Sequence, residues 1–186
     1  MDNGAGSYRR FREDDDAEGM AELVREYRDG LILYLDTFVR DIPAAEELAE
    51  DVFVLLAVKK PVYKAKSSFK TWLYAIGRNT ALDHLRKARR RGEIPLENCG
   101  ELHADGETLE ESFIREERRI AVHRAMRSLP ADQRQIIWLM YFEKLTASDA
   151  ARIMKRSPHA AETLAYRARK ALKQKLTEEG FEYEDL

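Results

Sequence analysis

The stretch FKTWLYAIGRNTALDHLRKARRR, residues 69–91, decides the fold of this chain. From Phe69 through Leu73 and Ile76 to Leu85, its apolar side chains recur at the spacing that places them on one face of a helix. The pattern ends in a run of cations, namely Arg86, Lys87, Arg89, Arg90 and Arg91. A helix that carries so much positive charge beyond its apolar face is expected to meet an anionic partner.

Two further helices are predicted ahead of this stretch. Within residues 20–40, Leu23, Tyr27 and Leu31 recur at intervals of four, on one helix face. Pro43, which suits the first turn of a helix, opens a second helix with inward-facing leucines and valines.

Length and composition suit one domain of ordinary size or two small ones. The chain has 186 residues, 44% of them hydrophobic, and its 32 basic residues nearly cancel 34 acidic ones. Because the net charge of -2 is a difference between large numbers, the position of each sign matters more than the total. Residues 1–19 are polar and are assigned to an N-terminal tail, and residues 178–186 to a C-terminal tail.

Neither a membrane segment nor a catalytic site is predicted. No window approaches the roughly 20 apolar residues that cross a bilayer, and the N-terminus has no apolar signal region, so the chain is expected to be cytoplasmic. Cys99 is alone, which excludes an internal disulfide and, without other ligands nearby, a zinc site. The histidines are scattered and no glycine-rich phosphate loop occurs. We therefore expect no enzyme activity, cofactor, metal or small-molecule substrate.

An acidic segment, residues 92–112, separates two helical halves. It contains Pro95, several glycines and many acidic residues up to Glu111, with no Lys or Arg, which is typical of a flexible linker. Two interpretations remain open: a solvated tether, or a strand that occupies a basic channel of a partner.

The second half, residues 113–177, is predicted to be a helix-turn-helix domain. Pro130 opens one helix, and the capping box TASD at residues 146–149 starts a short one. After a turn, Ser157 and Pro158 open a longer final helix. This order is typical of DNA-binding modules. The predicted fold class is therefore all-α, with two small helical domains joined by a flexible acidic linker.

Positive charge is concentrated in this final module. Between residues 152 and 175 there is a single acidic residue, Glu162, among Arg152, Lys155, Arg156, Arg167, Arg169, Lys170, Lys173 and Lys175. Together with the run that ends at Arg91, this gives two cationic surfaces, which is the electrostatic pattern of nucleic-acid binding. Complementation of helix dipoles at a solvated surface is the other interpretation.

The second helix has the opposite bias. Glu47, Glu50 and Asp51 share one of its faces. Like charges at this spacing destabilise a helix by about a few tenths of a kcal/mol per pair. This face is therefore either simply solvated or docks on a basic partner surface that is not DNA.

The loop that follows mixes basic and aromatic residues. Its members include Lys60, Tyr63, Lys64 and Lys66. Aromatic rings beside cations can stack on unpaired bases. We expect Phe69 and Trp72, at the start of the next helix, to be core residues, and the loop residues to contact bases or backbone.

Three of these segments, in this order, resemble bacterial RNA polymerase sigma factors of the extracytoplasmic function group. AEELAEDVFVLLAVKK resembles the family's core-polymerase-binding helix, and SSFKTWLYAIGRNTALDHLRKARRR resembles its promoter-melting and minus-ten-reading segment. LPADQRQIIWLMYFEKLTASDAARI resembles the start of its minus-35-binding domain. The resemblance implies a region 2 domain at residues 20–91 and a region 4 domain at 113–177, with the linker in the RNA exit channel. The implied partners are core RNA polymerase, promoter DNA and an anti-sigma factor.

The resemblance also implies a partner for each charged surface. Core polymerase would bind Glu47, Glu50 and Asp51. The minus-ten element would contact Lys60, Tyr63, Lys64, Lys66, Asn79, Asp83, Arg86, Lys87, Arg89 and Arg90. The minus-35 element would contact Lys155, Arg156, His159, Glu162, Arg167 and Arg169.

Glu162 departs from the family pattern, which has a basic residue at this position and another at that of Leu164. A carboxylate can accept a hydrogen bond from a cytosine amino group or repel phosphate, and both interpretations remain open.

Two other functions also remain open. A helix-turn-helix regulator would bind duplex DNA without polymerase, and an interaction adaptor of the same fold would not direct transcription. A sigma factor is expected to gain promoter specificity only together with polymerase.

Overall fold

The computed structural model describes residues 3–92 and 122–178 of the chain. All regular structure in these two ranges is helical, which confirms the predicted all-α class. The elements are α1 (Asn3–Asp14), α2 (Ala17–Val39), α3 (Ile42–Lys59), α4 (Phe69–Arg91), α6 (Ala131–Ile137), the π-helical turn η1 (Trp138–Phe142), α7 (Ala147–Met154) and α8 (Pro158–Glu178). Residues 122–128 are also helical. The acidic linker beyond Gly92 lies outside the described residues.

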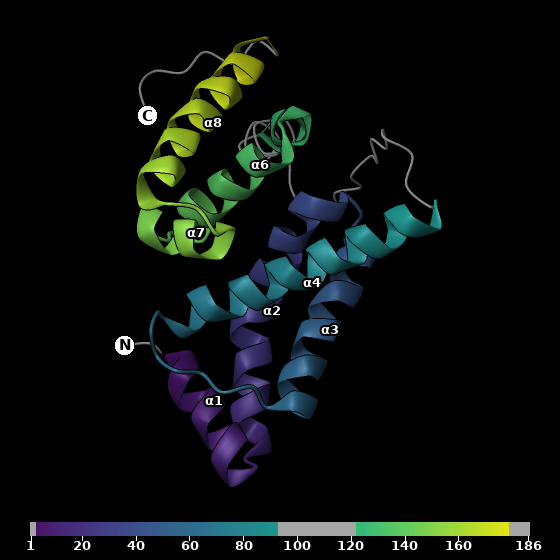
Figure 1. Ribbon diagram of the computed structural model, residues 1–186, viewed down its shortest axis with the longest axis vertical. Helices are drawn as coiled ribbons and strands as arrows, with labels where there is room; N and C mark the ends of the chain where they lie inside the picture. The colour runs from purple at the N-terminus through teal and green to yellow at the C-terminus, as the bar shows by residue number, and fades with distance from the viewer. Residues whose placement is uncertain (1–2, 93–121, 179–186) are drawn as a thin grey trace, which may run out of the picture.

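Helix α2 is the centre of the first half and packs against α1, α3 and α4 (Figure 1). The residues that it buries include the periodic Leu23, Tyr27 and Leu31 of the sequence. Helices α2, α3 and α4 each begin at a side chain that accepts a hydrogen bond from a first-turn N–H group; these caps are Asp16, Asp41 and Ser68. Such caps satisfy donors that have no partner within the helix.

Helix α1 differs from the tail expected for the N-terminal residues. Its Tyr8 is only 1% exposed. A Cβ atom on Gly19 of α2 would lie 2.5 Å from the backbone oxygen of Ser7, so the two helices approach backbone to backbone. This contact uses small residues and one tyrosine, and therefore leaves little hydrophobic periodicity in the sequence.

The second half contains the predicted helix-turn-helix. Thr146 caps α7 by accepting from the Asp149 N–H at 3.1 Å, and Ser157 accepts from the Ala160 N–H at 3.2 Å at the start of α8. Between them, Lys155 adopts a left-handed φ of 55°, which reverses the chain.

The two halves are in contact. Helix α4 lies between the helices of the first half and α7, and α2 also contacts α6 (Figure 1). Within residues 3–92 and 122–178, no helix is both long enough and apolar enough to cross a bilayer. The same residues contain no cluster of acidic, His or Cys side chains that could hold a metal ion.

Candidate nucleic-acid interface

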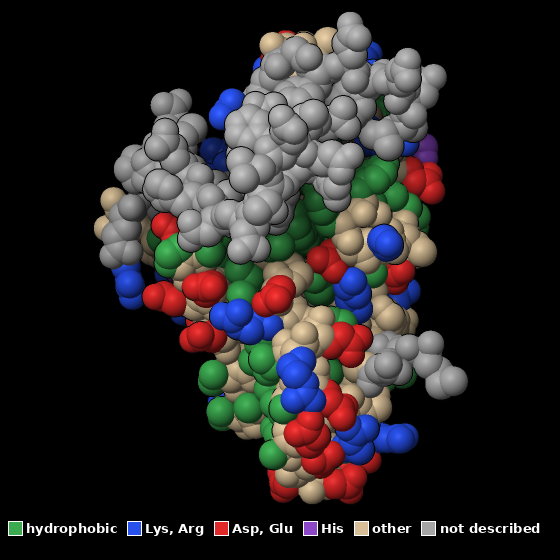
Figure 2. Space-filling view, turned by 180° about the vertical axis from the view of Figure 1, so that it is seen from behind, with side chains coloured by type: hydrophobic (Ala, Val, Ile, Leu, Met, Phe, Trp, Pro, Cys, Tyr) green, Lys and Arg blue, Asp and Glu red, His purple; other side chains and the backbone are tan. Residues whose placement is uncertain are grey.

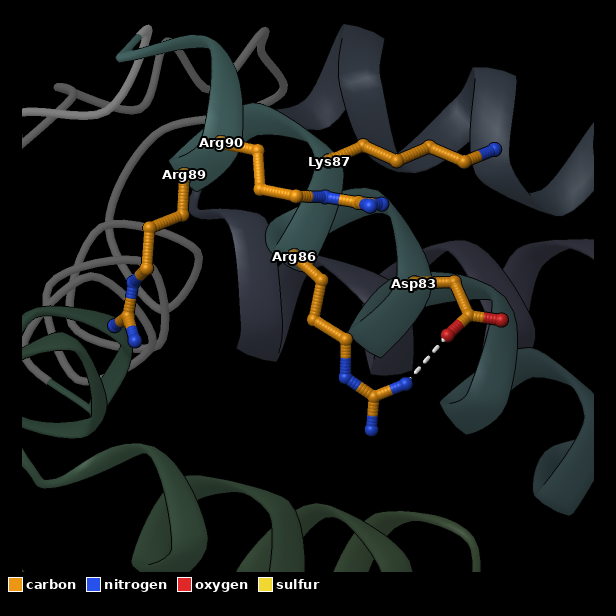
Figure 3. Close-up of a pocket in the computed structure, with 5 residues that line it drawn as sticks. All are labelled: Asp83, Arg86, Lys87, Arg89 and Arg90. Atoms are coloured by element: carbon orange, nitrogen blue, oxygen red, sulfur yellow. Dashed lines mark hydrogen bonds and ion pairs between the residues drawn. The ribbon is translucent and has the colours of Figure 1, made fainter.

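The basic end of α4 forms an open, cationic groove. It is lined by Asp83, Arg86, Lys87, Arg89 and Arg90, all exposed (Figure 3). Arg86 donates to Asp83 over 2.7 Å, while Lys87 and Arg90 extend together on one side and Arg89 points to the other (Figure 3). Because exposed ion pairs are weak, a phosphate can compete with Asp83 for Arg86. The groove therefore offers four cations to an anionic backbone.

In the loop between α3 and α4, two of the predicted lysines are exposed, whereas Lys60 is partly buried and pairs with Asp15, and the tyrosine packs against the core. Lys64 and Lys66 are exposed. The Tyr63 ring packs 5.6 Å from that of Phe69 and 5.3 Å from that of Trp72, and its hydroxyl donates to the Ser67 carbonyl. Phe69 is fully buried, as expected. Tyr63 is thus partly built into the aromatic core, and less of its ring is available to a base than the sequence suggested.

The outward face of α8 carries three of the six residues assigned to the minus-35 element. His159, Glu162 and Arg169 are exposed and recur at helical spacing on one face. Tyr166, which is 61% exposed, lies on the same face and was not predicted as a site residue from the sequence. Its position four residues after Glu162 is the signal that could have identified it. Arg167, although exposed, faces a different direction, because one residue turns the helix by 100°.

In the turn before α8, Lys155 and Arg156 are both exposed. The Arg156 guanidinium pairs with Asp132 at the start of α6. This pair is open to solvent and therefore exchangeable for a phosphate.

The acidic face of α3 also carries exposed apolar side chains. Glu47, Glu50 and Asp51 are exposed, and Val54 and Val58 continue the same face with 58% and 69% exposure. The view from behind shows hydrophobic side chains at the surface on the side of α3 (Figure 2). These valines were not predicted as site residues from the sequence, although their spacing of four and eight residues from Glu50 places them beside the acids.

The structure brings part of the two candidate DNA surfaces into contact with each other. Lys155 of the helix-turn-helix donates from Nζ to Oδ1 of Asn79 in α4, at 3.1 Å. Arg152 of α7 donates to the backbone carbonyl of Lys66 in the loop. Asn79 and Lys66 belong to the predicted minus-ten set and Lys155 to the minus-35 set. By contrast, α3 and its acidic face make no comparable contact with the second half among the described residues.

At the start of α4, Lys70 and Thr71 are also bound by the second half. The Lys70 ammonium lies 2.6 Å from Oε2 of Glu143 and 3.1 Å from its backbone oxygen. The Glu143 side chain is only 9% exposed and also accepts from the Trp138 indole at 3.1 Å. Thr71 donates to Asp149 over 3.1 Å. These bonds fix α4 against η1 and α7.

A second polar cluster joins α2 to the second half. Arg134 is 5% exposed and donates from Nε to the Thr37 carbonyl at 3.1 Å, while Arg40 donates to the Arg127 carbonyl at 2.7 Å. Arg127 lies 3.7 Å from Asp36. Burial lowers the pKa of Arg134 to about 10. Burial raises the pKa of Asp36, and the Arg127 charge opposes this effect. Charged side chains therefore connect the two halves at α2 as well as at α4.

Comparison with known proteins agrees with this division of the chain. Residues 23–91 match the family described as sigma-70 region 2, and residues 119–172 match sigma-70 region 4. Helices α2 to α4 fall in the first match apart from the start of α2, and α6 to α8 fall in the second apart from the end of α8.

Curated relatives and solved structures point to the same family. The RNA polymerase sigma-H factor of Pseudomonas aeruginosa is 29% identical over 81% of this chain and 82% of its own length. The ECF RNA polymerase sigma factor SigW of Bacillus subtilis is 24% identical over 87% of this chain and 90% of its own. The fold is shared with the sigma factor RpoE of Bartonella quintana in complex with the anti-sigma factor NepR, at a TM-score of 0.69 and 22% identity over 84% of this chain and 96% of that one. CnrH, in complex with the cytosolic domain of CnrY, has a TM-score of 0.63 at 18% identity over 94% of this chain and 95% of that one. The chain belongs to the sigma-70 family of RNA polymerase sigma factors, in its extracytoplasmic function group.

Proposed function

We propose that this chain acts in the cytoplasm as an alternative sigma factor that binds core RNA polymerase, recognises minus-35 and minus-ten promoter elements and promotes DNA melting. It catalyses no reaction of its own. Residues 20–91 form the unit for polymerase and the minus-ten element, and residues 113–177 form the unit for the minus-35 element.

The single observation that carries this proposal is the face of α3. Three carboxylates and the exposed Val54 and Val58 lie together on it. A carboxylate face repels phosphate, so it has no use in a regulator that binds only DNA. A basic protein surface with an apolar centre would pair with the acids and bury the valines, each worth about 1.5 to 3 kcal/mol if fully buried. Core polymerase is the partner that fits Glu47, Glu50 and Asp51.

The opposite charge of α4 supports a DNA contact on the same domain. In the proposed open complex, Arg86, Lys87, Arg89 and Arg90 bind phosphates beside the minus-ten element. The loop residues Lys60, Tyr63, Lys64 and Lys66, together with Asn79 and Asp83, contact an extruded base. Extrusion costs a few kcal/mol, which stacking and hydrogen bonds in the loop would offset.

The minus-35 element would be read by the outward face of α8. His159, Glu162 and Arg169 lie on that face, and we add Tyr166 to it, with Lys155, Arg156 and Arg167 as backbone contacts. A helix of this kind reads base edges in the major groove with its N-terminal residues.

DNA binding at both elements competes with the closed arrangement of the halves. Asn79 and Lys155 bond to each other, so each must exchange this exposed bond in order to contact its DNA element. The free chain is therefore expected to bind promoter DNA weakly and to bind well once polymerase holds the halves apart. RpoE was solved in complex with the anti-sigma factor NepR, and CnrH in complex with the cytosolic domain of CnrY. We propose that an anti-sigma factor binds this chain as well.

Transcription with purified components tests the proposal. The chain is added to bacterial core polymerase with a library of genomic fragments, and the start sites are mapped by sequencing the 5′ ends of the transcripts. New starts that share two elements at constant spacing are expected. Tight operator binding by the chain alone, without new starts, would favour the regulator instead. The absence of both DNA binding and new start sites would favour the interaction adaptor.

A further inference from the structure

We propose that helix α1 positions the loop between α3 and α4, residues 60–68, for the extruded minus-ten base, through Tyr8 and Arg12. The proposal rests on the proposed function of that loop. Helix α1 precedes the segment that matches sigma-70 region 2, which begins at residue 23.

The first support is the pair of hydrogen bonds from α1 to the loop backbone. The Tyr8 hydroxyl donates to the Pro61 carbonyl at 2.7 Å, and Arg12 Nε donates to the Lys60 carbonyl at 3.2 Å. Carbonyl groups just beyond a helix end have no partner within the helix and need one from outside. Lys60 also has a left-handed φ of 41°, which is uncommon for a residue with a side chain and needs support from its surroundings. Helix α1 therefore fixes the direction in which the chain leaves α3.

The second support is the aromatic cluster beneath the loop. The Tyr8 ring lies 5.4 Å from Phe69 and 5.3 Å from Trp72. Tyr63 of the loop packs on the same two rings. Tyr8 and Tyr63 thus pack on the same two aromatic rings. Loss of either tyrosine ring would therefore loosen the packing of the other.

The third support is the firm attachment of α1 itself. A Cβ atom on Gly4 would lie 2.6 Å from both Phe69 and Tyr27, so α1 sits against the core without space for a side chain. Ser7 and Arg10 both donate to Glu22 of α2, at 2.5 and 2.6 Å. Because α1 is fixed against the core in this way, its hydrogen bonds can restrain the backbone of the loop.

The exposed part of the loop lies between these fixed ends. Ser68 closes the far end by accepting from the Thr71 N–H at 3.1 Å, and Lys64 and Lys66 remain exposed between the two ends. A loop that is already ordered loses less conformational entropy when it binds a base. Tyr8 and Arg12 are therefore positioning residues, which raise affinity for opened DNA without touching it.

The experiment compares Tyr8→Phe and Arg12→Met with Arg9→Met, an exposed control on the same helix. Each full-length variant is assembled with core polymerase. Binding is measured for a fluorescent single strand that carries the minus-ten sequence and for a minus-35 duplex, and polymerase affinity is measured separately. Tyr8→Phe keeps the ring and removes one hydrogen bond. We expect about 5- to 10-fold weaker binding of the single strand, with unchanged affinity for the minus-35 duplex and for polymerase.

A second measurement does not depend on DNA. Trypsin cleaves after Lys64 and Lys66 in the isolated chain, and the rate follows the population of the loosened loop. Tyr8→Phe is expected to raise this rate severalfold over Arg9→Met. Equal loss of all three affinities, or wild-type affinity for the single strand together with a wild-type cleavage rate, would overturn the proposal. If wild-type holoenzyme bound no minus-ten strand while Tyr8→Phe still raised the cleavage rate, the proposed function would fail and α1 would remain an anchor of the loop without a role in DNA binding.

Discussion

The Lys70–Glu143 pair is the contact whose removal most directly tests whether the closed arrangement holds the halves together. Both bonds of the Lys70 ammonium go to Glu143, on the other half of the molecule. Lys70→Met keeps the length of the aliphatic side chain and removes only the charge. Glu143 retains its bond from Trp138, so the second half keeps its local structure.

The position of the pair sets the size of the effect. The Lys70 side chain is 31% exposed and that of Glu143 is 9% exposed. An exposed pair contributes about 0 to 1 kcal/mol, and loss of one partner of a fully buried pair costs about 3 to 5 kcal/mol. For this intermediate case we expect about 1 to 2 kcal/mol, which is about a 5- to 30-fold shift from the closed to the open arrangement.

Energy transfer between two dyes measures this equilibrium. The single native cysteine is removed by Cys99→Ser, and dyes are attached at Glu47→Cys on α3 and Lys173→Cys on α8, both exposed in the structure. Lys59→Met, an exposed lysine at the end of α3, is the matched control. The low-transfer population should grow in Lys70→Met and stay constant in Lys59→Met. Identical transfer distributions for the two variants at low salt would show that this ion pair does not hold the halves together.

Three further substitutions test other parts of the molecule. Val58→Ser should leave the thermal unfolding midpoint unchanged, because the side chain is 69% exposed, and weaken polymerase binding by about 5-fold or more; unchanged affinity would remove Val58 from the interface. Glu162→Lys should tighten DNA binding by holoenzyme and steepen its salt dependence by up to about 0.9 in log K per log salt, whereas an unchanged slope and affinity would place Glu162 away from DNA. The pKa of Asp36 is raised by burial in the folded chain, so its favourable contribution is present below the ordinary value of about 3.9 and is lost as the pH rises through the folded pKa. The free energy of unfolding of Asp36→Asn should therefore rise relative to that of the wild type between about pH 3.5 and pH 7. A fall in this difference over the same pH range, measured by denaturant unfolding, would contradict the burial of a charged Asp36.

The helices that the sequence predicted well are those with long apolar stripes and side-chain caps. Residues 20–40 and 69–91 correspond to α2 and α4, and the caps at Thr146 and Ser157 start α7 and α8. These signals are local, because a stripe and a cap each depend on residues within a few positions of one another.

The features that the sequence did not predict depend on contacts between distant residues. Helix α1 packs through glycines and Tyr8, which periodicity cannot distinguish from a polar tail. The π-helical turn η1 ends at Phe142, and the Glu143 N–H bonds the Trp138 carbonyl at 3.0 Å. A turn of this kind is set by its surroundings rather than by propensity. The contact of Lys155 with Asn79 joins residues 76 positions apart, beyond the reach of any local pattern.

The closed arrangement gives Lys70 an effect on DNA affinity that is opposite in sign to that of an ordinary phosphate contact. A lysine that binds phosphate lowers affinity when it is removed, because fewer counterions are released. A lysine that holds the halves closed raises affinity when it is removed, because apparent affinity is the intrinsic affinity multiplied by the open fraction. If the free chain is mostly closed, Lys70→Met should bind promoter DNA more tightly, by up to the same 5- to 30-fold that shifts the equilibrium. Once polymerase holds the halves apart, that gain should disappear. Weaker DNA binding by free Lys70→Met would therefore identify Lys70 as a phosphate contact and exclude its role in closing the molecule.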